Sequence, residues 1–330
     1  MTDVYVLHEN NEWLAPLQAA LSRESVPFKE WHLNEGSFTF DSAPPEGVFY
    51  NRMSASAHTR GHLHAPDYTA SVLTWLEAHG RRVVNGARVL ALELSKVKQY
   101  AALQACGVRT PRTVVAVGKD ALRKAARDFG APLILKPNRG GKGAGVQLFN
   151  TNGAVEAFLD SDAYETGPDG IMLIQDYIKS PNASIFRNEF VGGKHLYTVR
   201  VDTSQGFELC PADVCQIDDL ACPVGEETGE ELGESPTPRF EIVKDFDHPN
   251  LELYERFLRE NGIEVAGIEM IFDKDGIAWT YDVNTNTNYN PEAEAASGRT
   301  GTARSGPGAI ADFLDRELFH AANPTLAAAE

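Results

Sequence analysis

Two segments near the carboxyl end of the chain carry side chains that could bind a divalent cation. Glu269 lies in the apolar run Gly-Ile-Glu-Met-Ile-Phe, where burying an unpaired carboxylate is costly. Asp282 and Asn284 are two residues apart in a second run, so on a strand they share one face. The turn-forming sequence Asp-Lys-Asp-Gly at 273–276 predicts a hairpin that brings Glu269 to that face. Three oxygen ligands, completed by phosphates, describe a Mg²⁺ site.

The segment after Asp282 has two alternative interpretations. Asp-x-Asn-x-Asn opens an EF-hand loop, but that loop needs Gly at its sixth position and Glu at its twelfth, where this chain has Thr287 and Ala293. Asparagine side chains also cap backbone groups in turns, which remains an alternative for Asn286, Asn288 and Asn290.

A glycine-rich segment in the middle of the chain could bind phosphate. It reads Lys-Pro-Asn-Arg-Gly-Gly-Lys-Gly-Ala-Gly from Lys136 to Gly145, and its glycines let backbone N–H groups approach an anion closely. Gly143 follows Lys142, which excludes a P-loop, and the strand predicted to follow excludes a dinucleotide-binding loop. A flexible loop on a β-hairpin remains, with an ordinary turn as the alternative. Lys136 favours phosphate binding because its charge, at the end of an apolar strand, is costly to bury.

The first ninety residues alternate strand and helix patterns, which predicts an α/β unit with a parallel sheet. The expected strands are 4–7, 47–50 and 83–84, and the expected helices are 11–25 and 66–79. Asn51 and Arg52 follow the second strand, at the end where such sheets bind ligands. Arg52 could therefore clamp a substrate carboxylate, or it could be an ordinary surface residue.

The remaining residues continue with mixed helical and strand patterns. The patterns predict helices over 94–107, 120–129, 251–261 and 307–319, and strands over 113–117, 132–136, 145–149, 171–178, 185–203 and the 265–284 hairpin.

Composition narrows the class of protein. The 330 residues suit two or three packed subdomains, and a net charge of -17 without a dense basic cluster argues against nucleic acid as a partner. We expect a cytoplasmic protein without a membrane span, because no apolar run approaches about 20 residues and no signal peptide is recognisable. Four cysteines without a C-x-x-C pair are expected to be reduced, which disfavours a zinc site.

Taken in order, several segments resemble the ATP-grasp superfamily, and most closely the RimK-like amino-acid and peptide ligases. The resemblance covers about residues 90–320. It is carried by Leu94-Ser-Lys96, Lys136 with the glycine loop, Ile174-Gln-Asp-Tyr-Ile178, Arg187 before Val191-Gly-Gly193, Val265-Ala-Gly-Ile-Glu269, and Asp282-Val-Asn284. It implies an ATP-grasp fold with three parts: an N-terminal α/β domain (1–90), a central subdomain with a glycine-rich lid (91–178) and a C-terminal subdomain with the metal site (179–330).

The resemblance also implies roles for single residues. The phosphates of ATP would be contacted by Lys96 and Lys136 and covered by Gly140, Gly141, Lys142, Gly143 and Gly145. The nucleoside would lie against Gln175, Asp176, Tyr177 and Ile178, and one or two Mg²⁺ ions, with Mn²⁺ as a substitute, against Glu269, Asp282 and Asn284. Arg187 or Arg200 would steady a phosphorylated carboxylate. Substrate contacts are expected from Asn51, Arg52, Asn286 and Asn288.

The implied activity is ATP-dependent joining of a small-molecule or peptide carboxylate to an amine through an acyl phosphate, releasing ADP and phosphate. A non-catalytic ATP-binding module is the alternative, and homo-oligomerisation stays open. This chain departs from the family at Glu269 and Asp282, where Asp and Glu are usual in that order, and at Thr285–Asn288, where a Ser-Pro-Gly-like turn is common. The acidic segment 216–238 is expected to be a mobile loop on the substrate side that makes no contact with ATP.

Overall fold

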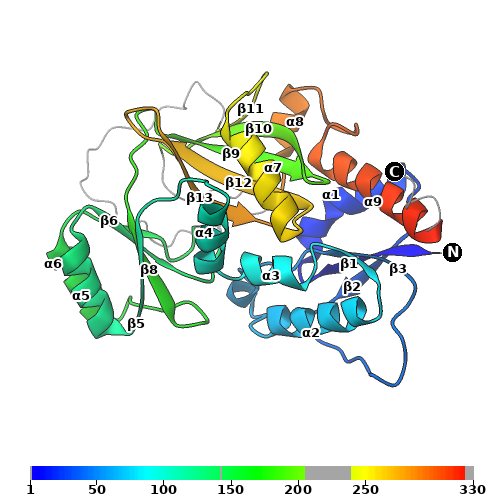
Figure 1. The fold of residues 1–330 in the computed structure, drawn as a ribbon, viewed down its shortest axis with the longest axis horizontal. Coiled ribbons are helices and arrows are strands. Elements are labelled where there is room, and N and C mark those ends of the chain that lie inside the picture. The colour runs from blue at the N-terminus through cyan, green and yellow to red at the C-terminus, as the bar shows by residue number, and fades with distance from the viewer. Residues whose placement is uncertain (1, 142, 205–238, 324–330) are drawn as a thin grey trace.

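The computed structural model describes residues 2–141, 143–204 and 239–323, and these form three sheets covered by helices (Figure 1). Lys142, the acidic segment 216–238 and Cys210, Cys215 and Cys222 lie outside the described residues. No helix of the described residues is long and apolar enough to cross a membrane.

The N-terminal part contains the predicted parallel sheet. Its elements are β1 (Asp3–His8), α1 (Asn11–Arg23), β2 (Phe28–His32), β3 (Gly47–Asn51), η1 (Ala57–Arg60), α2 (Ala65–Ala78), β4 (Arg82–Val84) and α3 (Ala87–Glu93). The strand order is β2-β1-β3-β4, with every pair parallel. Helix α1 packs on one face, through residues such as Leu14 and Leu17, and α2 packs on the other through Val72 and Leu73. The carboxyl ends of β1 and β3 therefore meet at one edge, where Arg52 follows β3.

The central part positions the glycine loop. It consists of α4 (Lys96–Ala105), β5 (Thr113–Val117), α5 (Lys119–Phe129), β6 (Leu133–Pro137), β7 (Gln147–Phe149), α6 (Asn152–Asp160) and β8 (Ile171–Asp176). The antiparallel sheet has the order β5-β8-β6-β7, and α5 and α6 pack on one of its faces. Strands β6 and β7 pair directly, so the loop joins two strands of a hairpin, as predicted.

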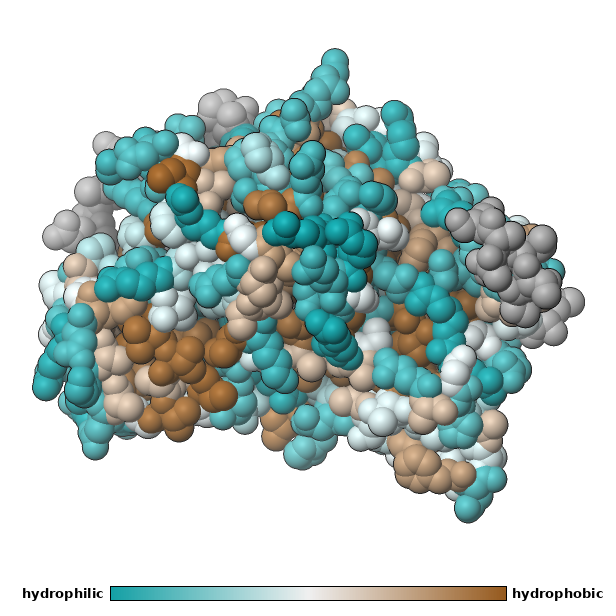
Figure 2. All heavy atoms as spheres, viewed as in Figure 1, coloured by the Kyte–Doolittle hydropathy of each residue, from teal (hydrophilic) through white to brown (hydrophobic). Residues whose placement is uncertain are grey.

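One edge of the central sheet carries an apolar surface. Strand β5 lies at the end of the strand order, and Val114, Val115 and Val117 are 37%, 48% and 65% exposed. Figure 2 shows hydrophobic atoms gathered on this side of the molecule, over the region where Figure 1 places β5 and β8. This surface lies on the central sheet beyond the residues that line the cavity described below.

The C-terminal part forms the third sheet. Its elements are β9 (Ser184–Val191), β10 (Lys194–Asp202), β11 (Phe240–Val243), α7 (Asn250–Asn261), β12 (Val265–Phe272), β13 (Ala278–Asn284), α8 (Pro291–Ala296) and α9 (Gly306–Ala322). The antiparallel order is β11-β10-β9-β12-β13. Helices α4 and α7 bury one face through Tyr100, Leu103, Tyr254 and Phe257. The other face of β9, β12 and β13 is left to form a cavity wall.

The three sheets fall within the three predicted segments, and the division at residues 90 and 178 stays a prediction. Helix α9 belongs to the third segment but packs on the first sheet beside α1 (Figure 1), burying Ile310 and Leu314 there. Asn85 also ties the first sheet to the third. Its amide donates to the carbonyls of Val265 and Thr285, and its oxygen accepts from the backbone N–H of Val265. The N-terminal and C-terminal walls of the cavity are therefore bonded to each other.

Six short elements were not predicted from sequence: β2, η1, α3, α6, β11 and α8. Strand β2 lies at a sheet edge and has no fully buried residue, so it lacks an apolar run. The helix predicted over 94–107 is present as α4, and the unpredicted α3 precedes it, separated from it by Leu94 and Ser95. The Ser95 hydroxyl accepts from the backbone N–H of Lys98 and caps α4, which places Lys96 in its first turn.

Candidate active site

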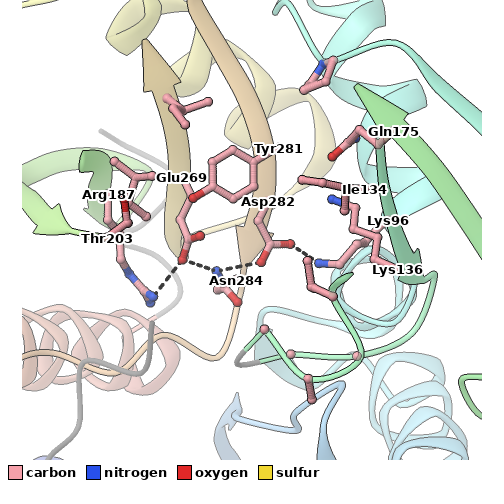
Figure 3. A pocket seen from close by; sticks show the side chains of 18 of the residues that line it. Lys96, Ile134, Lys136, Gln175, Arg187, Thr203, Glu269, Tyr281, Asp282 and Asn284 are labelled. Carbon is pink, nitrogen blue, oxygen red and sulfur yellow. Dashed lines mark hydrogen bonds and ion pairs between the residues drawn. The ribbon is translucent and has the colours of Figure 1, made fainter. Parts of the chain in front are cut away.

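A cavity of about 860 Å³ lies where the three parts of the chain meet, and most of the predicted site residues line it (Figure 3). The predicted residues in its wall are Lys96, Lys136, Gly140, Gly141, Gly143, Gln175, Asp176, Tyr177, Ile178, Arg187, Glu269, Asp282, Asn284, Asn286 and Asn288. Asn51, Arg52, Gly145 and Arg200 are not among the lining residues.

The candidate metal ligands share one face because of the hairpin that joins β12 to β13. Glu269 and Asp282 are direct partners across the two strands, and Asn284 follows two residues later. The pairing shifts register next, so that Met270 faces Thr280 and Tyr281 is an extra residue in a β-bulge. As a result Tyr281 lines the cavity beside Asp282, which ordinary strand alternation would not allow.

Four charged groups and one amide form a continuous chain of contacts at this wall. The Asn284 amide nitrogen lies between the two carboxylates, 3.3 Å from Glu269 Oε1 and 3.5 Å from Asp282 Oδ2 (Figure 3). Lys96 Nζ bonds to Asp282, and Arg187 Nη1 lies 3.2 Å from Glu269 Oε1. The network is compact enough for one cation to contact both carboxylates if the amide turns its oxygen inward.

The pKa values of the two carboxyls are shifted in opposite directions, because burial dominates at Glu269 and neighbouring positive charge dominates at Asp282. Burial raises the pKa of Glu269, although Arg187 pulls it down. Burial also opposes ionisation of Asp282, but the charge and hydrogen bond of Lys96, together with the charges of Lys136 and Arg187, hold the pKa of Asp282 below its usual value. Among the described residues, no group of three or more His, Cys, Asp or Glu could hold a metal ion. The oxygen donors of two carboxylates and one amide fit Mg²⁺, provided that phosphates and water complete the shell.

Lys136 has no anionic hydrogen-bond partner in the part of the chain that the structure describes. It is 5% exposed, and its Nζ donates to the Tyr100 hydroxyl at 2.7 Å and lies 5.9 Å from the Tyr281 ring centroid. Burial first, and then the neighbouring charge of Lys96, lower its pKa to about 7. A buried amine that faces a cavity without a carboxylate partner is suited to an anionic ligand.

The glycine loop closes one side of the cavity. Gly140, Gly141 and Gly143 line it, and a Cβ on Gly141 would lie 3.5 Å from the Cβ of Ser56 in the N-terminal part. Gly145 has φ +73° and is packed against Pro137, which explains the need for glycine there. The loop therefore lies directly against the N-terminal part of the wall.

The segment 175–178 lines the opposite part of the wall. The Gln175 side chain donates to the Thr113 hydroxyl, and the Asp176 carboxylate is 3.0 Å from Arg112 Nη2. Apolar residues Ile134 and Leu148 of β6 and β7 line the cavity as well. This end offers an apolar slot bordered by backbone, as a flat heteroaromatic ring requires.

The two candidate arginines differ in position. Arg187 is buried in the wall, where its guanidinium donates to Glu189, Glu269 and Thr287. Arg200 on β10 does not line the cavity, and its guanidinium pairs with Glu241 at 3.1 Å. The structure therefore brings Arg187 to the site and leaves Arg200 outside it.

Arg52 lies behind the wall and holds other residues in place. It is 7% exposed, and its guanidinium donates to the side chains of Asn286 and Asn288 and to the carbonyls of Trp13 and Thr287. Asn51 is also buried, and its amide donates to the Asn85 carbonyl. Both residues thus support the wall from behind.

Replacing Arg52 with Lys is expected to destabilise the protein by roughly 1.5–3 kcal/mol, because one ammonium cannot reproduce a planar guanidinium bonded to four groups. Urea unfolding measures the change. The control is Arg81→Lys. Arg81 is more exposed, and its guanidinium donates to the backbone carbonyls of Pro44 and Pro45. An unchanged unfolding midpoint for Arg52→Lys would mean that Arg52 is not structural.

Several lining residues escaped the sequence analysis: Trp13, Ser54, Ser56, Glu93, Thr203 and Tyr281. Glu93 accepts bonds from the backbone N–H of Ala55 and from both the N–H and hydroxyl of Thr285. Its partners are 38 and 192 residues away along the chain, so no local pattern could indicate them. The one local indication of a buried role for Glu93 was that it is a single acidic residue among the apolar residues of α3.

Comparisons with known proteins agree with the resemblance noted in the sequence. A family model described as a RimK-like ATP-grasp domain matches residues 94–207. A probable alpha-L-glutamate ligase of Saccharophagus degradans is 29% identical over 140 residues, which are 42% of this chain and 46% of the relative. The alpha-aminoadipate–LysW ligase LysX of Sulfolobus acidocaldarius is 30% identical over 148 residues, 44% of this chain and 53% of the relative. The matches span about half the length of these relatives.

Solved structures extend the likeness to nearly the whole chain. The RimK domain ATP-grasp protein of Sphaerobacter thermophilus has a TM-score of 0.63 at 19% identity, covering 94% of this chain and 99% of that one. The ATP-grasp ligase PsnB in complex with minimal precursor, Mg and ADP has a TM-score of 0.60 at 16% identity, covering 96% and 99%. The predicted ATP-grasp fold is thereby confirmed.

Proposed function

We propose that this chain, of which residues 94–207 match the model of a RimK-like ATP-grasp domain, is an ATP-dependent ligase that joins a carboxylate to an amine. The observation that carries the proposal is one cavity wall: two lysines, Lys96 and Lys136, face the carboxylates of Glu269 and Asp282 beside Asn284. Phosphoryl transfer from ATP requires cationic side chains that bind the phosphates and oxygen ligands that bind magnesium.

The nucleotide would lie along the cavity with its base at the apolar end. Ile134 and Leu148 would contact the ring, and the backbone of 175–178 would bond to its edge. Asp176 would bind the ribose after loosening its pair with Arg112. Lys136, Lys96 and the backbone N–H groups of Gly140, Gly141 and Gly143 would then hold the phosphates.

Glu269, Asp282 and Asn284 would hold one or two Mg²⁺ ions, for which Mn²⁺ could substitute. When bound, the metal supplies charge neutralisation on the transferred phosphoryl group. Lys96 would leave Asp282 as the carboxylate gains a metal contact, and its ammonium would turn to the phosphates. Asn284 would turn its amide to present its oxygen to the metal, because its nitrogen is the atom that lies toward the carboxylates here.

The acid substrate would be converted into an acyl phosphate, which the amine then attacks with release of phosphate. Arg187 stands beside Glu269 and would orient the reacting carboxylate through its remaining N–H groups. The glycine loop, already in contact with Ser56, would exclude water that hydrolyses the intermediate. Peptide and amino-acid substrates are both compatible with this scheme, and a cytoplasmic location, where ATP is supplied, belongs to the proposal.

The test is a panel of amino acids and dipeptides incubated with MgATP and scored by phosphate release and product mass. We expect phosphate release only when an acid and an amine are both present, with a product lighter than their sum by one water. A non-catalytic ATP-binding module would bind ATP tightly and release no phosphate with any pair. That second outcome would replace the ligase proposal by a binding role.

A further inference from the structure

Glu93, the last residue of α3, places a buried carboxylate in the cavity wall. The residue is 9% exposed and lines the cavity. Its Oε2 accepts from the backbone N–H of Thr285 at 2.7 Å and from the Thr285 hydroxyl at 2.9 Å, and its Oε1 accepts from the backbone N–H of Ala55 at 3.3 Å. A carboxylate can accept roughly four hydrogen bonds, so these donors leave one accepting position at Oε1.

The charge of this carboxylate is not balanced by a cation within the part of the chain that the structure describes. All three donors are neutral groups, and burial raises the pKa of Glu93. Lys96 lies three residues further along the chain, but its ammonium bonds to Asp282 and would turn to the phosphates in the proposed complex. By contrast, the buried carboxylates of Glu189 and Glu269 both contact Arg187. A buried carboxylate that faces a cavity without a cationic partner is suited to a cationic ligand.

Glu93 connects the wall that carries the candidate metal ligands to the N-terminal wall. Its partner Thr285 directly follows Asn284, and its partner Ala55 lies in the loop after β3. Figure 3 shows Arg187 on one side of the two candidate metal-binding carboxylates and Lys96 on the other. Because Glu93 precedes Lys96 by only three residues, it belongs to the side of the cavity away from Arg187.

The neighbouring polar groups of the wall are hydroxyls. Ser54 and Ser56 flank Ala55 in the chain, and both line the cavity. Their oxygens lie 2.9 Å apart and can each accept a hydrogen bond. A primary ammonium group has three N–H donors, no acceptor and a positive charge, so it matches one carboxylate oxygen beside two hydroxyls.

We infer that Glu93 binds the ammonium group of the amine substrate through Oε1, with the hydroxyls of Ser54 and Ser56 as further acceptors. The inference rests on the proposed ligase function and assigns one of its two substrates to a place in the cavity. An acid held beside Arg187 and an amine held by Glu93 would approach the metal ligands from two sides. The positively charged amine is thereby drawn to the cavity and kept apart from the cations that bind phosphate.

The test is an equilibrium titration of the MgADP complex, followed by ligand-observed NMR, with glycinamide, alaninamide and β-alaninamide. Each is paired with its hydroxyl analogue (glycolamide, lactamide and 3-hydroxypropanamide), which replaces the ammonium with a neutral group. We expect at least one amine to bind about tenfold tighter than its analogue, as one charge-assisted hydrogen bond would give. Equal affinities in all three pairs, or no binding of any amine, would overturn the inference. Failure to bind MgADP would refute the proposed function and the inference with it.

The Glu93→Gln variant locates the preference. Glutamine keeps an oxygen for Thr285 and lacks the charge, so the variant should lose the preference for the ammonium compound and keep its affinity for MgADP. The matched control is Glu77→Gln. Glu77 also accepts from a backbone N–H, that of Ala87, but it is exposed and outside the cavity, so this variant should behave as the wild type. A preference that survives in Glu93→Gln would assign the ammonium to another group.

A second variant separates ligand binding from support of the wall. Thr285→Val removes the hydroxyl bond to Glu93 Oε2 and leaves Oε1 in place, so it should lower Tm and keep the ammonium preference. Loss of the preference in Thr285→Val to the same extent as in Glu93→Gln would show that Glu93 only anchors the wall. The wild-type titration needs no substitution, so the inference can be overturned even if Glu93→Gln does not fold.

Turnover assays on Glu93→Gln test the assignment to the amine substrate. We expect the KM for the amine to rise about tenfold, while the KM values for the acid and for ATP stay within about twofold of wild type. A KM raised for the acid alone, or raised equally for all three substrates, would contradict the assignment.

Discussion

Asp282→Asn is expected to lower kcat for ADP formation by on the order of 10² to 10³-fold, because one charge that offsets the developing phosphoryl charge is lost. Asp282 is the direct cross-strand partner of Glu269 and bonds to Lys96. The substitution keeps the shape of the side chain and an oxygen for Lys96, so the fold should survive. Steady-state kinetics over a range of Mg²⁺ concentrations measures the effect.

The control for this prediction is Asp275→Asn, which makes the same change in the exposed turn of the same hairpin. It should leave kcat and the dependence on Mg²⁺ unchanged. Asn284→Ala should resemble Asp282→Asn, since it removes the third oxygen donor from the wall. Wild-type turnover by either cavity variant at ordinary Mg²⁺ concentration would show that these residues do not hold the metal.

Lys136→Met is expected to weaken ATP binding roughly 10- to 100-fold, the range that the loss of one charged hydrogen bond to a phosphate would give. The same substitution should stabilise the ligand-free protein. Burial lowers the pKa of Lys136 to about 7, so the folded state disfavours the charged amine that the unfolded chain carries. Met fills a similar volume without that cost. A substitution that weakens ATP binding but raises the stability of the protein identifies a ligand-binding lysine, whereas loss of a structural lysine would lower the stability.

The stability gain of Lys136→Met should depend on pH in a defined direction. A lysine whose pKa falls on folding loses stability as the pH falls from its unfolded pKa near 10.4 towards about 7. The variant's advantage in Tm should therefore be small at pH 10, grow as the pH is lowered, and become constant below pH 7. Lys98→Met, at an exposed position on the same helix as Lys96, is the control. A lower Tm for Lys136→Met together with unchanged ATP affinity would contradict the phosphate role.

Strand periodicity predicted the most important cluster correctly. Two-residue alternation placed Asp282 and Asn284 on one face, and the Asp-Lys-Asp-Gly turn brought Glu269 opposite them, as the register of β12 and β13 confirms. Tyr281 was missed because the same rule turns it away from the cavity. The bulge that brings it back depends on pairing with β12, and a single strand carries no sign of it.

Arg52 shows why other parts of the site could not be predicted. Its place after β3 suggested a ligand contact, but its partners are Trp13 and residues 286–288, which are 39 and 234–236 positions away. Arg200 was a candidate because the family resemblance implied an arginine at the reacting carboxylate, but the β10–β11 pairing places Glu241 beside it instead. Sequence patterns locate faces of elements, whereas the identity of a buried group's partner depends on how distant elements pack.

The claim that the reaction proceeds through an acyl phosphate is tested most directly by following an oxygen atom of the substrate carboxylate into the released phosphate. The acid substrate found in the panel would be labelled with ¹⁸O in its carboxylate and incubated with unlabelled MgATP and the amine. A ligase that proceeds through an acyl phosphate transfers one labelled oxygen from each acid to phosphate, because the C–O bond breaks when the amine attacks. We predict one ¹⁸O in each phosphate released, by mass spectrometry. Phosphate free of label alongside the amide product would contradict the acyl-phosphate route.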